Sequence, residues 1–136
     1  MSHPPILDVD AAPDLLARLR ADLCAADYTV AGVQALLGPL AFDALHREEA
    51  LPARRVLRGV LEAGAASADA DRRRAALAAV FLLGDAVARD ALALALPALG
   101  LDGARTLGLT RDVDPDRVRA RFDLRPYAAD DAAGHL

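Results

Sequence analysis

The sequence predicts a mainly α-helical protein: an N-terminal helical bundle packed on a winged-helix-like domain that ends in a C-terminal β-hairpin. Two observations carry this prediction. Three apolar helical segments follow one another between Arg72 and Leu107, each stopped by glycine or proline. After the turn-forming triplet Asp114-Pro115-Asp116, apolar and charged side chains alternate over residues 117–124, which is the repeat of a half-buried strand. Three helices followed by a hairpin are typical of a winged helix.

The three helical segments differ in character. The first begins near Arg72, contains the apolar run 75–83 and stops at the following glycine. The second covers 86–96 and ends before a proline, and the third covers 101–107 and ends before a glycine. The three arginines that open the first segment oppose the helix dipole, so acidic residues or a partner must compensate them.

The N-terminal half predicts four further helices. Asp10 is the expected N-cap of a helix that reaches Ala26, and Thr29 is the expected N-cap of a short helix that closes at Gly38. Pro39 suits the first turn of the next helix, and a fourth is expected over 52–63.

The first helix has one apolar stripe, and arginines and Asp22 lie off it. Together with the other helical repeats and the final alternation, this stripe predicts the buried core. The expected core residues are Leu16, Leu19, Leu23, Val33, Leu37, Phe42, Leu57, Leu77, Val80, Phe81, Leu92, Leu96, Leu107, Val118 and Phe122.

Small residues between Gly64 and Ala70 have little to bury, so they predict a linker between the two helical halves. The resulting organisation has five parts. These are a flexible arm (1–9), an N-terminal helical subdomain (10–63), the linker (64–70), a winged-helix-like subdomain (71–127) and a disordered tail (128–136).

Composition limits the classes of function. The chain has 136 residues and a net charge of −4 at pH 7, which argues against a general nucleic-acid-binding protein. Residues 1–70 hold ten acids and six arginines, whereas residues 71–136 hold ten of each, so the second half is relatively basic. A lone cysteine and the absence of a long apolar run or a basic leader predict a cytoplasmic protein with no membrane segment.

Catalytic chemistry is not evident. Cys24 is expected as a small buried hydrophobe rather than a reactive thiol. His46 has two nearby glutamates but no second histidine or cysteine at metal-ligand spacing, so no metal site is predicted. The sequence also has no glycine-rich phosphate loop and no serine in a nucleophile motif.

Two basic features remain as candidate sites. Arg54 and Arg58 share one face of a predicted helix. A row on the last strand, continued past it, forms the candidate docking surface: Arg117, Arg119, Arg121 and Arg125. This row is either a solvated strand face or a surface that docks a phosphate backbone or an acidic protein. The third helix of the winged-helix half offers only Arg105 as a long base reader, which argues against sequence-specific DNA binding.

Four strings spread over most of the chain stand out: Leu36-Leu37-Gly38-Pro39, Ala44-Leu45-His46-Arg47-Glu48, Phe81-Leu82-Leu83-Gly84 and Asp123-Leu124-Arg125-Pro126-Tyr127-Ala128. In their order and spacing they resemble the N-terminal, non-catalytic domain of a group of actinobacterial class I S-adenosylmethionine-dependent methyltransferases, related to small-domain and release-factor glutamine methyltransferases. In that family the last string leads into a Rossmann-like catalytic domain. The glycine-rich cofactor loop and the Asn-Pro-Pro-Tyr-type motif of that domain are absent here, so no catalytic or cofactor-binding residue carries over.

The resemblance implies an accessory domain, not an enzyme on its own, that positions a protein or RNA substrate for a methyltransferase catalytic domain in cis. S-adenosylmethionine is then expected only in that catalytic domain, with no cofactor in this chain. The alternative is a free-standing winged-helix interaction or regulatory module. A reading frame that continues past Leu136 into a glycine-rich strand–loop–helix would favour the first hypothesis.

Overall fold

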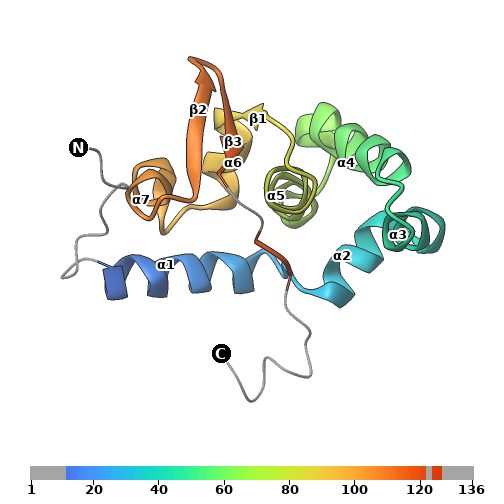
Figure 1. Ribbon diagram of the computed structural model, residues 1–136, viewed down its shortest axis with the longest axis horizontal. Coiled ribbons are helices and arrows are strands. Elements are labelled where there is room, and N and C mark those ends of the chain that lie inside the picture. The colour runs from blue at the N-terminus through green and yellow to red at the C-terminus, as the bar shows by residue number, and fades with distance from the viewer. Residues whose placement is uncertain (1–11, 122–123, 127–136) are drawn as a thin grey trace.

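The computed structural model describes residues 12–121 and 124–126, and over this range the protein is mainly helical with a small antiparallel sheet (Figure 1). The expected arm, the tail, the N-cap Asp10 and the core residue Phe122 lie outside the described residues. The elements in chain order are α1 (Ala12–Ala25), α2 (Val30–Leu37), α3 (Pro39–His46), α4 (Leu51–Ala63), the 3-10 turn η1 (Gly64–Ala66), α5 (Asp69–Leu77), the π-helix η2 (Ala78–Leu82), β1 (Val87–Ala88), α6 (Arg89–Ala95), α7 (Gly100–Thr106), β2 (Thr110–Asp114) and β3 (Arg117–Ala120).

The boundaries of α2 and α3 follow the local chemistry that the sequence predicts. The Thr29 side chain accepts a hydrogen bond from the backbone N–H of Gly32 at 2.9 Å, which caps the first turn of α2. Gly38 ends α2 with a φ of 84°, a conformation that glycine adopts without strain. Pro39 then begins α3, where its missing N–H would be unpaired in any case.

The helix α5 begins earlier than the sequence predicts, and this resolves the conflict with its dipole. Its first turn carries Asp69 and Asp71, so Arg72, Arg73 and Arg74 lie further along the helix. The linker expected over 64–70 therefore contains η1 and the first residues of α5.

The second half has the element order of a winged helix: a helix, a short strand, two helices and a hairpin. The strands lie in the order β1-β3-β2 and both pairings are antiparallel. The turn 114–116 joins β2 to β3, as predicted. The strand β1 was not predicted, because its two residues are too few for a periodic pattern and the sequence assigned them to a helix.

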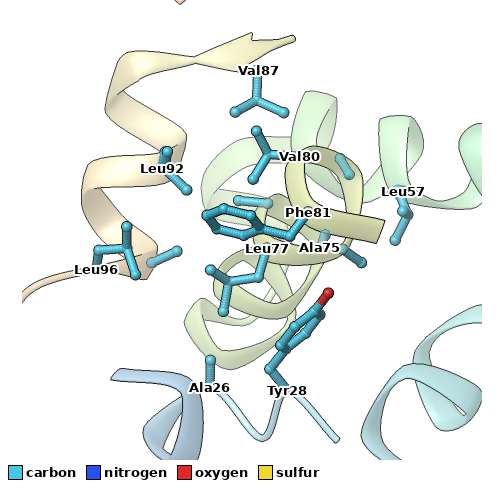
Figure 2. Packing of buried hydrophobic residues seen from close by; sticks show 14 of the residues in the cluster. Ala26, Tyr28, Leu57, Ala75, Leu77, Val80, Phe81, Val87, Leu92 and Leu96 are labelled. Atoms are coloured by element: carbon cyan, nitrogen blue, oxygen red, sulfur yellow. The ribbon is translucent and has the colours of Figure 1, made fainter. Parts of the chain in front are cut away.

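One hydrophobic core joins the two halves. Phe81 is fully buried on η2 and lies among Leu77, Val80 and Leu92, while Tyr28 approaches from the α1–α2 corner (Figure 2). Most of the predicted core residues are confirmed as buried or packed against this core.

Three burial predictions for α1 are wrong, because the apolar stripe is rotated from the expected one. Leu16 is 46% exposed, and Leu15 packs against the core instead. Cys24, expected to be buried, is exposed. Asp22, expected off the stripe, is 3% exposed.

Two polar contacts tie the N-terminal helices to the winged-helix half, and we call them the seam. The Asp22 carboxylate accepts hydrogen bonds from the backbone N–H groups of Ala98, at 3.0 Å, and Leu99, at 2.8 Å. The Arg74 guanidinium donates to the backbone carbonyls of Ala26 at 3.0 Å and Gly32 at 3.3 Å. Each charged group thus satisfies backbone groups at a helix end or loop.

The chain beyond β3 is anchored at Leu124. Its N–H donates to the carbonyl of Phe81 at 3.1 Å, and its carbonyl accepts a 2.6 Å hydrogen bond from the buried Tyr28 hydroxyl. Residue 124 therefore joins η2 and the α1–α2 corner.

Candidate binding groove between helix α4 and the sheet

The four arginines of the predicted docking row do not lie on one strand. Arg117 and Arg119 are exposed on β3, but the strand ends at Ala120. The N–H of Arg121 bonds the carbonyl of Leu109 at 2.8 Å, and Arg125 lies beyond the anchored Leu124. The alternation continues in the sequence, yet the paired residues of β2 and β3 end at Thr110 and Ala120, and Arg121 adds only this one backbone hydrogen bond.

Arg117 and Arg119 line a groove together with α4, whose position beside the β1 side of the sheet is visible in Figure 1. The groove has a volume of about 380 Å³. Its lining comes from α4, η2, the β1 segment and β3: Arg54, Leu57, Arg58, Leu61, Glu62, Ala79, Asp85, Ala86, Val87, Ala88, Arg117 and Arg119. The two basic features that the sequence shows separately, Arg54 with Arg58 and the β3 arginines, thus meet at one site.

The groove is amphipathic. Leu57, Ala79 and Val87 belong to the buried core and supply apolar lining. The charged lining consists of four arginines and two acids, a formal charge of +2 in a chain whose net charge is −4. A positive, partly apolar concavity in an acidic protein concentrates anionic ligands.

Two of the four arginines have acidic partners. Arg54 Nε donates to Asp85 Oδ2 at 2.8 Å, and this hydrogen bond raises the pKa of Arg54 above its ordinary value. Arg117 Nε donates to Asp114 Oδ2 at 2.9 Å. The pKa of Asp114 is lowered, first by the hydrogen bond from the Asp116 N–H and then by that from Arg117.

The other two cations, Arg58 and Arg119, have no ion pair among residues 12–121 and 124–126. Arg119 also faces Arg111 directly across the β2–β3 pair. Like charges at opposite positions of a sheet disfavour folding slightly, and an anionic ligand would relieve this repulsion. Arg58 and Arg119 are therefore the cations in the groove available to bind a ligand.

The position of the Asp85 side chain is set by the irregular backbone at the end of η2. The N–H of Leu83 bonds the Ala78 carbonyl at 3.0 Å, in the wider spacing of a π-helix, and the N–H of Asp85 bonds the Ala79 carbonyl at 2.9 Å. Gly84 makes the turn with a φ of 74°. This geometry carries no sequence signal beyond the glycine, so sequence reasoning missed Asp85.

Arg121 belongs to a different concavity. It lines a hollow with Arg105, Thr110, Arg111 and Asp112. Asp112 accepts hydrogen bonds from Arg105 at 3.3 Å and from Arg89 at 2.7 Å. Arg105, the basic residue of α7, is therefore already engaged within the fold.

Metal and membrane features can be stated for the described part of the chain. It contains no cluster of three metal-ligating His, Cys, Asp or Glu side chains. His46 instead packs edge-on against Phe42, with ring centroids 4.7 Å apart. None of the helices in this part combines the length and apolar character that a membrane span requires.

The fold and the groove together define a helical, winged-helix-like domain with a basic groove. Residues 25–121 match a protein family described as Domain of unknown function (DUF7059), and the chain belongs to that family. Searches of curated proteins and of solved structures gave no match.

Proposed function

We propose that this chain is a non-catalytic recognition domain whose groove between α4 and the sheet docks an anionic partner. The observation that carries the proposal is the position of Arg58 and Arg119, two cations without acidic partners in the described range, beside an apolar floor. The largely buried Arg74 is bonded to backbone carbonyls, whereas these two side chains are exposed toward solvent.

In this proposal the domain is the accessory part of an S-adenosylmethionine-dependent methyltransferase and positions a protein or RNA substrate for a catalytic domain outside this chain. The sequence resemblance supports this assignment. The anchored Leu124 supports it as well, because it gives the Arg125-Pro126 segment, where the resemblance places the passage into the catalytic domain, a fixed starting point.

A second candidate is a free-standing winged-helix interaction or regulatory module. The observation that favours it is the complete winged-helix element order with a β1-β3-β2 sheet, which forms a packed unit within this chain. The same groove would then dock a regulatory partner instead of a methyltransferase substrate.

The groove can be tested by fluorescence anisotropy with two labelled anionic probes, poly-glutamate and a single-stranded RNA, at low and high ionic strength. Wild-type protein should bind at least one probe, more weakly at high salt. The double variant Arg58→Ser/Arg119→Ser should lose at least about tenfold in affinity, because each arginine supplies a charge-assisted hydrogen bond. The charge-matched control is Arg20→Ser/Arg55→Ser, which removes two exposed arginines outside the groove lining.

Equal losses in both double variants would mean that only net charge matters, and the proposed site would be wrong.

A separate measurement tests the non-catalytic role. Calorimetric titration of the chain with S-adenosylmethionine should show no binding, because the sequence lacks a glycine-rich cofactor loop. A dissociation constant at or below about 1 μM, typical of a dedicated site, would contradict that role.

A further inference from the structure

The groove continues into a second hollow. The second hollow has a volume of about 250 Å³ and shares Leu61 and Ala88 with the groove. Its other lining residues come from η1, from α5 and from α6: Gly64, Arg72, Asp90, Ala91 and Leu94. Two adjoining concavities suit an extended chain better than a compact small molecule.

The free edge of β1 lies where the two hollows meet. Val87 pairs with Val118 in register, and the N–H of Arg89 donates to the Asp116 carbonyl at 2.8 Å. Backbone groups alternate in direction along an antiparallel pair, so those of Val87 and Arg89 face β3 and those of Ala88 face away from it. The Ala88 carbonyl belongs to the N-cap of α6, so an extended peptide beside β1 would find the backbone N–H of Ala88 as its hydrogen-bonding group.

Arg72 is one of the residues that line the second hollow. Its guanidinium bonds the exposed carboxylate of Asp69 through NH2. Its Nε is buried and has no hydrogen-bond partner among the described residues. A buried donor without an acceptor is costly, so this guanidinium is incompletely satisfied within the fold.

We infer that the occupant of the groove is an extended, acidic segment of a partner protein, laid beside β1 across both hollows. Its carboxylates pair with Arg58 and Arg119, its apolar side chains contact Leu57 and Leu61, and its backbone bonds Ala88. This inference rests on the proposed function and specifies its ligand.

The charge and lining of the two hollows favour a peptide over a nucleic acid. The lining contains three acids, Glu62, Asp85 and Asp90, which would repel a continuous row of phosphates. Leucine, valine and alanine make up much of the remaining lining, and a phosphate backbone gives them nothing to contact. A peptide offers carboxylates, apolar side chains and backbone groups together.

The test uses a labelled short peptide of alternating glutamate and leucine, measured by anisotropy against the full chain. Reference probes are the glutamine–leucine and glutamate–serine versions of the peptide, and a single-stranded RNA of the same net charge. The glutamate–leucine peptide should bind tightest of the four, since the other probes lack its carboxylates, its apolar side chains or its peptide backbone.

The decisive variant is Ala88→Pro. Ala88 has a φ of −60° and precedes the first residue of α6, so proline fits the backbone and removes only the N–H on the free edge. Peptide affinity should fall about threefold to tenfold, the effect of one hydrogen bond, while RNA affinity stays unchanged. Ala88→Ser, which keeps the N–H, is the control, and unchanged thermal melts would show that both variants fold.

The outcomes separate the two proposals. Groove-dependent binding of RNA with no preference for the peptide would overturn the peptide inference and leave the recognition role standing. Peptide binding unaffected by Ala88→Pro in a folded variant would overturn the β1-edge geometry. If neither probe responds to Arg58→Ser/Arg119→Ser, the recognition role itself fails.

Discussion

Arginine has opposite roles in the seam and in the groove. At the seam, the Arg74 side chain is 13% exposed and is bonded to two backbone carbonyls on the N-terminal helices. In the groove, Arg58 and Arg119 are exposed and have no ion pair in the described range. The sequence places all of them on amphipathic elements, so residue type alone does not separate the two roles. The partners that each guanidinium meets decide whether it stabilises the fold or remains free for a ligand.

The largest effect is expected at the acidic side of the seam. Asp22→Ala should lower the free energy of unfolding by about 2–4 kcal/mol, because it leaves the buried N–H of Leu99 and the part-buried N–H of Ala98 without an acceptor. Asp22→Asn keeps one acceptor oxygen and should lose about half as much. Urea denaturation of the three proteins measures this. If Asp22→Ala and Asp22→Asn are equally stable, the carboxylate does not hold the 98–99 loop.

A smaller effect is expected at the basic side of the seam. Arg74→Met keeps the apolar stem but removes the donors to Ala26 and Gly32, and should cost about 1–3 kcal/mol. The matched control Arg55→Met, on an exposed position of α4, should change stability by less than about 0.5 kcal/mol. Anionic-probe binding should be unchanged in Arg74→Met. A loss of binding in a folded protein would remove the distinction between seam and groove.

The smallest effect is expected at the hairpin turn that flanks the groove. The folded-state pKa of Asp114 lies below its ordinary value of 3.8, so its carboxylate stabilises the fold above that pH and the contribution disappears as the pH falls through the lowered pKa. Asp114→Asn should therefore lower the melting temperature slightly at neutral pH, and the difference from wild type should vanish in acid. Thermal melts across an acid-to-neutral pH series measure it, and a difference independent of pH would contradict the ion pair with Arg117.

Local chemistry made much of the fold predictable. The cap at Thr29, the break at Gly38 and Pro39, and the turn before Arg117 depend on neighbouring residues only, and all three are confirmed. The burial of Asp22 was not predictable in this way, because it depends on a loop far along the chain. The length of β3 depends on where its partner strand β2 begins. The alternating pattern within β3 carries no information about that position.

The candidate site was predictable only in parts. The sequence identified the arginine pair on α4 and the arginines on β3, but their meeting across one groove depends on how α4 packs against the sheet. Arg121 and Arg125 were included because a strand pattern extends to them, and they lie outside that groove. The docking role of Arg117 and Arg119 stays a prediction.

The anchor at Leu124 has a mechanical consequence. Tension applied to the chain beyond this residue is carried by its hydrogen bonds to Phe81 and Tyr28, and not by the β2–β3 ladder. The load therefore enters η2, the same short helix that contributes Ala79 to the groove. The family match ends at residue 121, so a chain cut there would lose this load path together with the hydrogen bond from Tyr28 to Leu124. Through Leu124, a pull on the following chain would reach η2 and the α1–α2 corner directly.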